Sequence, residues 1–185
     1  MRVIAGALKG RRLQTPDWEG LRPTSDKLRE TLFNVLAPRI DGARVLDGFA
    51  GTGAVGIEAL SRGAAHVTFV ESDPRAVQLI QRNLEHCRVG DRYAIIRARF
   101  ADASRRLSAG SFGLVFLDPP YRSEDMAGVL EAAAPLVAPD GLVVLEHARR
   151  DLAPAAVSSI MKTRDLFSGD SALAIYEPRA EQLAP

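Results

Sequence analysis

From residue 43 onwards, short apolar runs alternate with segments whose apolar residues recur at helical spacing. This alternation brings successive strands back to one edge of a sheet, so it predicts a parallel sheet with helices on both faces. The expected strands span residues 44–47, 66–71, 94–97, 114–118 and 142–146. The expected helices span residues 55–62, 74–86, 103–107 and 125–136.

Two further strands are expected near the C-terminus, at residues 163–167 and 172–176, after one short helix that follows Pro154. So few residues separate these strands that they must be antiparallel, because a parallel crossover needs about a dozen residues. A parallel sheet that ends in an antiparallel hairpin resembles the sheet of Rossmann-like methyltransferases. We therefore expect a three-layer α/β fold with a mostly parallel sheet.

The chain begins with a short segment that differs from this pattern. Extended candidates around Gly6 and Gly10 predict a small β-hairpin. We expect residues 1–20 to form a hairpin extension and residues 21–185 to form the main domain.

The first helix of that domain has apolar residues at helical spacing. Thr24 or Ser25 can cap its start, and Pro38 is expected to end it. The apolar positions are Leu28, Leu32, Val35 and Leu36.

Composition narrows the class of protein. The chain has 185 residues, of which 46% are hydrophobic and 25% are charged, as in an ordinary globular domain. No apolar stretch approaches the ~20 residues of a membrane span, and the opening residues lack the apolar region of a signal peptide. The single cysteine, Cys87, is expected to pack in the core, and the histidines show no metal-ligand spacing. We expect a cytoplasmic monomer that binds no metal and no membrane.

The net charge of +1 excludes a chain that binds nucleic acid over its whole surface. Basic residues gather at the N-terminus, where no acid precedes Asp17. Arginine suits phosphate contacts, although a GC-rich genome would also favour arginine codons. We expect RNA contacts from Arg2, Lys9, Arg11 and Arg12.

Residues 47–56 follow the first strand of the predicted sheet and open a helix. Gly51, Gly53 and Gly56 match the G-x-G-x-x-G fingerprint, in which the backbone turns tightly and approaches a ligand closely. Asp47 changes the interpretation, because its carboxylate would repel a pyrophosphate and attract an ammonium group. S-adenosylmethionine carries an ammonium and a sulfonium but no phosphate, so it is the cofactor that we expect.

Acids also follow the next two strands. Glu71 ends the second strand, where an acid can accept both ribose hydroxyls of NAD or of S-adenosylmethionine. Asp102 could accept the adenine amino group, with Phe100 as an apolar wall. Structural alternatives stay open: a helix cap for Asp47, an exposed strand end for Glu71 and a helix N-cap for Asp102. The expected cofactor residues are Asp47, Gly48, Phe49, Gly51, Gly53, Glu71, Ser72, Asp102 and Thr24.

Asp118-Pro119-Pro120-Tyr121 follows an apolar run that is typical of a buried strand. These residues do not help a core, because Asp is costly to desolvate and Pro cannot donate to a sheet. Asp118 and the Pro119 carbonyl can instead accept the two hydrogens of an amino group, and Tyr121 can stack on the attached base. We expect these four residues to be the catalytic residues of a nucleobase amino-methyltransferase.

This motif resembles that of amino-methyltransferases, which include adenine-N6 DNA enzymes and guanine-N2 RNA enzymes. Residues 2–6, 9–13, 21–34 and 58–64 resemble the bacterial 16S rRNA (guanine-N2)-methyltransferase family, within the class I S-adenosylmethionine-dependent enzymes. The resemblance implies methylation of one guanosine in 16S rRNA, in the 30S subunit or an assembly intermediate. It implies RNA contact by the N-terminal extension, and Arg22 could bind a phosphate or line the cofactor site. Gly48 departs from the family pattern, which has a bulky apolar residue there.

Three other functions remain open. The glycine fingerprint and Glu71 would suit an NAD-dependent oxidoreductase, which leaves Asp118 and its neighbours unexplained. A non-catalytic RNA-binding module could keep this fold, but the intact motif argues against it. An adenine-N6 methyltransferase is the nearest alternative, although no separate target-recognition domain fits in 185 residues.

Overall fold

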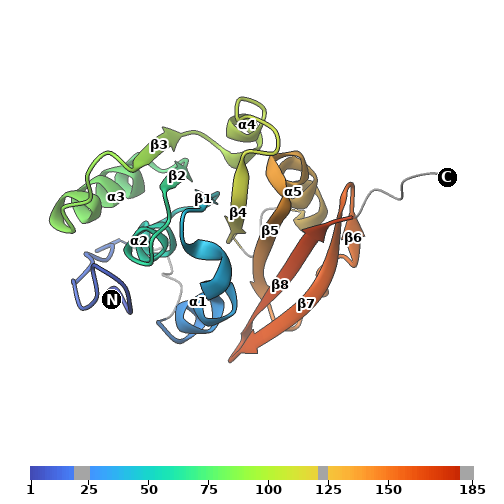
Figure 1. Ribbon diagram of the computed structural model, residues 1–185, viewed down its shortest axis with the longest axis horizontal. Coiled ribbons are helices and arrows are strands. Elements are labelled where there is room, and N and C mark those ends of the chain that lie inside the picture. Colours follow the sequence, from blue (N-terminus) through green and yellow to red (C-terminus); the bar gives the residue numbers. More distant parts are fainter. Residues whose placement is uncertain (19–25, 121–124, 180–185) are drawn as a thin grey trace.

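The computed structural model describes residues 1–18, 26–120 and 125–179, and an eight-stranded sheet forms its centre (Figure 1). The strands lie in the order β3-β2-β1-β4-β5-β8-β7-β6. Their bounds are β1 Arg44–Asp47, β2 His66–Glu71, β3 Tyr93–Arg97, β4 Phe112–Leu117, β5 Val137–Ala148, β6 Ala156–Val157, β7 Ile160–Ser168 and β8 Ser171–Pro178. The helices are α1 Asp26–Ile40, α2 Ala54–Ser61, α3 Pro74–His86, α4 Phe100–Ser104 and α5 Met126–Ala133, followed by the 3-10 turn η1 Ala134–Leu136.

The sheet is mixed in direction, as predicted. Strands β1 to β5 pair in parallel, and β8 joins β5 in the antiparallel direction. Strands β7 and β8 form a hairpin that turns through Gly169, whose φ of 61° lies in the left-handed region that glycine tolerates. The antiparallel C-terminal hairpin is therefore confirmed.

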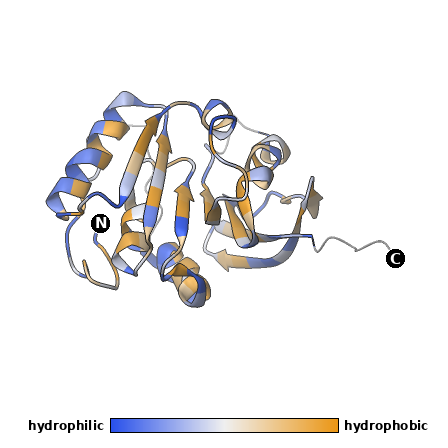
Figure 2. Ribbon diagram, turned by 45° about the horizontal axis from the view of Figure 1, so that its top comes forward, coloured by the Kyte–Doolittle hydropathy of each residue, from blue (hydrophilic) through white to orange (hydrophobic). Residues whose placement is uncertain are grey.

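Helices cover both faces of the sheet, so the predicted three layers are present. One apolar cluster lies under α1, α2 and α3 and includes Ile57 and Phe116. The other lies under α4 and α5 and includes Phe100 and Leu117. Because Phe116 and Leu117 are neighbours on β4, they show the alternation that sends successive side chains to opposite faces. In Figure 2 the hydrophobic colour is concentrated on the strands between these layers.

The N-terminal segment folds back on itself and packs beside α2 (Figure 1). Arg2 and Arg12 form an antiparallel bridge, and the Val3 N–H donates to the Arg11 carbonyl at 2.9 Å. The side chains of Val3 and Leu13 are buried in the cluster under α1, α2 and α3. The predicted hairpin is thus present, and apolar burial holds it against the rest of the protein.

A buried ion pair fixes the hairpin to two helices. Glu58 on α2 accepts hydrogen bonds from the backbone N–H groups of Ile4 at 2.8 Å and Ala5 at 3.0 Å. Arg29 on α1 is fully buried; it lies 3.6 Å from the Glu58 carboxylate and donates to the Arg2 carbonyl at 2.8 Å. Burying both charges is tolerated because each is held by several partners.

Pro38 does not end the first helix, so that prediction is wrong. Helix α1 continues to Ile40, with Pro38 inside its last turn. Leu36 and Ile40 are both buried, so packing on the sheet holds the last turn although proline cannot donate to it.

Two other element predictions are also wrong. The segment after Pro154 forms β6 instead of a helix, because Val157 and Ile160 bury their side chains in a tight β6–β7 hairpin that turns at Ser158. Helix α4 begins at Phe100, three residues before the predicted start. Phe100 is 3% exposed, and burial of its side chain stabilises a helix that begins at this residue.

Candidate active site

The carboxyl ends of adjacent parallel strands bring the predicted acids to one edge of the sheet. Asp47 is the last residue of β1, and Glu71 is the last residue of β2. Asp118 directly follows β4, which pairs with β1. Because parallel strands end at the same edge, three acids from distant parts of the sequence become neighbours across the sheet.

Asp47 is buried and accepts a hydrogen bond from the first turn of α2, whose N-cap is Gly53. Its Oδ2 accepts a hydrogen bond from the Gly56 N–H at 3.0 Å, within the first turn of α2. Burial raises the pKa of Asp47 to about 7, the Gly56 hydrogen bond opposes that rise, and the nearby Glu71 charge adds to it. Asp47 is therefore not the N-cap of α2, but its carboxylate has a structural partner in the Gly56 N–H, and a ligand cation would favour its ionised form.

Glycine is required in the loop for two different reasons. Gly53 has φ 77°, which a side chain rarely adopts. Gly56 has an ordinary φ, but a Cβ there would collide with the Phe69 ring, so glycine lets α2 approach β2 closely.

Gly48, which departs from the family pattern, has a local explanation. A Cβ at Gly48 would lie 2.8 Å from Leu117 and 2.9 Å from Phe100. The Phe100 ring in turn lies 5.3 Å from the ring of Phe49. Phe100 therefore fills the space beside the loop that a bulkier residue at position 48 would need.

Glu71 organises the backbone on both sides of the β2 end. One carboxylate oxygen accepts the Gly51 N–H at 2.9 Å, and the other accepts the N–H groups of Ser72 at 2.7 Å and Asp73 at 2.8 Å. It is therefore not a loose, exposed strand end. A carboxylate has about four lone-pair directions, so a ribose hydroxyl can still be accepted.

Asp102 is the least constrained of the predicted cofactor residues. Its side chain is 53% exposed and lies 3.5 Å from Arg105, one turn along α4. It does not cap α4, because Arg99 occupies the N-cap position. Contact between Asp102 and an adenine amino group remains a prediction.

The expected catalytic residues lie only partly within the described chain. Asp118 is half-buried, Pro119 is buried and Pro120 is exposed. Tyr121, Thr24 and Arg22 lie outside the described residues.

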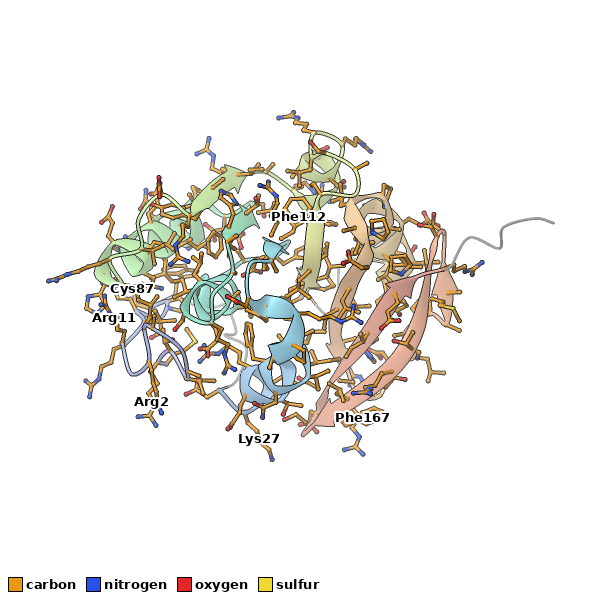
Figure 3. All side chains as sticks on the ribbon, in the orientation of Figure 1. Arg2, Arg11, Lys27, Cys87, Phe112 and Phe167 are labelled. Atoms are coloured by element: carbon orange, nitrogen blue, oxygen red, sulfur yellow. The ribbon has the colours of Figure 1, made fainter. Side chains whose placement is uncertain are left out.

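The N-terminal basic residues differ in their surroundings. Arg2, Lys9 and Arg12 are exposed. Arg11 instead donates to the Cys87 carbonyl at 2.5 Å, at the end of α3, and Figure 3 shows the two residues side by side. Arg11 therefore helps to anchor the hairpin.

A cleft of about 400 Å³ lies between the hairpin and the start of α1. Lys27 lines this cleft together with Arg2 and Lys9, and the sequence pattern did not single it out. Its position in the first turn of α1 gave no signal, because only the folded hairpin brings it beside the other cations. Asp26 and Glu30 also line the cleft, so its charge is mixed.

Within the described residues, His, Cys, Asp and Glu side chains form no group of three or more that could hold a metal ion. In the same parts of the chain, no helix combines the length and apolar character needed to cross a membrane.

Known proteins match nearly the whole chain. Residues 1–177 match the family model described as Conserved hypothetical protein 95. Ribosomal RNA small subunit methyltransferase D of Escherichia coli K12 is 35% identical over 98% of this chain and 91% of its own length. YlbH of Bacillus subtilis, provisionally named an rRNA methyltransferase, is 39% identical over 97% of this chain and 100% of its own.

Solved structures agree with these matches. The yhhF structure from Escherichia coli, provisionally described as a methyltransferase, has a TM-score of 0.85 and 34% identity over 98% of this chain and 99% of that one. A hypothetical protein of Thermus thermophilus has a TM-score of 0.79 and 30% identity over 96% of this chain and 99% of that one. The predicted class I methyltransferase fold is thereby confirmed.

Proposed function

We propose, because the chain belongs to the family described as Conserved hypothetical protein 95, that it is an S-adenosylmethionine-dependent methyltransferase of 16S ribosomal RNA. It transfers a methyl group to the exocyclic N2 of one guanosine. The observation that carries this proposal is that Asp118 follows β4 directly, next to the β1 strand that leads into the glycine loop. The relatives named rRNA methyltransferases support it.

Asp118 and the Pro119 carbonyl hold the amino group of the target base. The lone pair of guanine N2 is delocalised into the ring, so the free amine is a poor nucleophile. Hydrogen bonds from both of its hydrogens to fixed acceptors favour a pyramidal nitrogen and free that lone pair. Prolines restrict the backbone, so the acceptors are oriented before the base arrives.

The residues around the glycine loop fit the proposed cofactor. S-adenosylmethionine supplies, when bound, a methyl group on a positively charged sulfur. Asp47 is a buried carboxylate with a raised pKa, and an ammonium beside it would favour its ionised form. Glu71 holds the loop and keeps capacity for one ribose hydroxyl, and Phe49 and Phe100 form an apolar wall for adenine.

The N-terminal hairpin is the proposed RNA contact of this otherwise neutral protein. Arg2, Lys9 and Arg12 are exposed and can meet phosphates. The target guanosine must leave its stack to reach Asp118, which is easier for a loop nucleotide than for a paired one. The 30S subunit or an assembly intermediate, in the cytoplasm, is the proposed partner of a monomeric enzyme.

The test is methyl transfer to 30S particles from a strain that lacks this protein. Tritiated methyl incorporation, followed by mass spectrometry of the digested RNA, should place one methyl group on N2 of one guanosine. Asp118→Ala should abolish incorporation while S-adenosylhomocysteine affinity stays within a few fold. Asp91→Ala, an exposed loop change, is the matched control and should keep full activity.

Two outcomes would contradict the proposal. Methylation at adenine N6 would assign the enzyme to the nearest alternative class. Binding of NADH in calorimetry, without binding of S-adenosylhomocysteine, would favour an oxidoreductase.

A further inference from the structure

A second acid, Glu146, occupies on the neighbouring strand β5 the place that Asp118 has after β4. The apolar run 114–117 on β4 is followed by Asp118, and the apolar run 142–145 on β5 is followed by Glu146. These strands are parallel and pair Leu117 with Leu145. Asp118 lies just beyond the last residue of β4, so this register, continued by one residue, would bring it opposite Glu146 at the spacing of about 4.8 Å between paired strands.

Side-chain alternation gives the face of the sheet on which Glu146 lies, and the face that Asp118 would share if its backbone continues the strand. Phe116 and Val144 contribute to the cluster under α1, α2 and α3, whereas Leu117 and Leu145 contribute to the opposite cluster. Side chains alternate along a strand, so Glu146 turns to the face of Val144. For the same reason, an extended backbone at residue 118 turns that acid to the face of Phe116.

Glu146 is a buried acid near the carboxyl end of β5. It is 4% exposed, and its partner across the β5–β8 ladder is the buried Leu173. Burying a carboxylate carries a large desolvation cost, which contacts of Glu146 within the protein offset. A carboxylate has two oxygens with about four lone-pair directions, so it can accept a donor from a ligand in addition to contacts within the protein.

The hydrogen bonds from the amino group to Asp118 and the Pro119 carbonyl do not distinguish guanine from adenine, because both bases carry a planar amino group. The neighbouring ring nitrogen does distinguish them. In guanine, N1 carries a hydrogen next to the N2 amine, whereas in adenine N1 is a bare acceptor. A carboxylate at that position is satisfied by guanine and repelled by adenine.

We propose that Glu146 accepts the N1–H of the target guanine and thereby selects guanine over adenine. This inference rests on the proposed function, because it assumes that Asp118 holds the amine of the same base. Glu146 is a base-recognition residue that contacts the Watson–Crick edge, one strand further from the cofactor loop than Asp118.

The test uses 30S particles reconstituted with splint-ligated 16S rRNA that carries guanosine or 2-aminopurine at the modified position. 2-Aminopurine keeps the exocyclic 2-amine but has no hydrogen on N1. For the unmodified enzyme, kcat/KM on 2-aminopurine should be lower by about 100-fold or more. Comparable rates on the two bases would overturn the proposal without any variant.

Glu146→Gln should lower kcat/KM on guanosine by about 10- to 100-fold, because the neutral amide is a weaker acceptor. Its N–H group can donate to the bare N1 of 2-aminopurine, so the preference for guanosine should fall by about 10-fold or more. A purely structural Glu146 would lower both rates equally, and that result would overturn the proposal. Glu146→Asp keeps the charge and should keep the preference at a reduced rate.

Glu177→Gln is the matched control, because Glu177 lies on β8 of the same sheet with a side chain that is 45% exposed. It should leave both rates unchanged. S-adenosylhomocysteine affinity and thermal unfolding of each variant confirm the folded state. Failure of the unmodified enzyme to methylate the guanosine particle would instead contradict the proposed function.

Discussion

Asp47 at the end of β1 accepts a hydrogen bond from the Gly56 N–H at 3.0 Å, across the whole glycine loop. The bond joins two residues nine positions apart in the sequence, and Asp47 is only 1% exposed. The loop therefore rests on a buried acid whose charge state depends on pH.

That dependence gives a prediction about stability. The pKa of Asp47 is raised from 3.8 to about 7, so the folded protein binds a proton there that the unfolded chain has released. Its contribution to the free energy of unfolding should be full below pH 4 and should fall as the pH rises to about 7, at no more than about 1.4 kcal/mol per pH unit. Urea unfolding gives the free energy of unfolding of the ligand-free protein and of Asp47→Asn, and the difference between the two values should change with pH. A constant difference between pH 4.5 and 7.5 would contradict the prediction.

Gly56 should not tolerate even a methyl group. Gly56→Ala places a Cβ against the Phe69 ring and should lower the free energy of unfolding by about 1–3 kcal/mol. Gly128→Ala on α5 is the matched control, because its Cβ would meet nothing closer than 3.7 Å. There, the change should stabilise by about 0.5–1 kcal/mol through helix propensity. Denaturant titration separates the two results, and equal effects would refute the packing argument.

Glu58 should govern the order of the N-terminal hairpin. Glu58→Gln removes the buried charge that faces Arg29 and weakens the acceptor for the Ile4 and Ala5 amides. The free energy of unfolding should fall by about 3 kcal/mol, because Arg29 is left buried with a weaker partner. Hydrogen exchange of the two amides should accelerate. Glu30→Gln, at an exposed position of α1, should leave both measurements unchanged.

Basic residues of the hairpin and of α1 should differ in how their removal changes the salt dependence of RNA binding. Lys9→Ala and Lys27→Ala should each weaken binding to 16S rRNA and reduce the slope of log K against log salt by about 1. Arg11→Ala should instead lower the free energy of unfolding by about 1–2 kcal/mol, because Arg11 holds the Cys87 carbonyl.

Arg105→Ala is the control for that experiment, since Arg105 is 78% exposed beside α4 on the opposite face of the sheet. It should change neither the slope nor the stability. An Arg11 variant with a reduced slope and unchanged stability would show that the structural assignment of Arg11 is wrong.

Patterns within short segments predicted much of this fold. The apolar runs located β1, β2 and β4, and the two acids at the ends of β1 and β2 could be placed at one edge because parallel strands end together. The short link before Ser171 predicted an antiparallel hairpin by geometry alone. These features depend on neighbouring residues in the sequence, so they can be read without the fold.

The errors arose where distant residues decide the outcome. Pro38 ends a helix in isolation, but buried neighbours carry α1 past it. The sequence pattern did not single out Arg29, which is fully buried because Glu58 and the hairpin surround it. The glycine at position 48 becomes necessary only when Phe100 packs beside it.

Helix α2 contacts both the proposed cofactor loop and the N-terminal hairpin that is proposed to bind RNA. Its first turn donates to Asp47 through the Gly56 N–H, and its last turn holds the N-terminal hairpin through Glu58 and Ser61. The eight residues of α2 span only about 12 Å, so the two contacts lie at opposite ends of one short helix. The proposed RNA contact and the proposed cofactor loop are thus joined by one helix, so a change that displaces the hairpin should also disturb the loop.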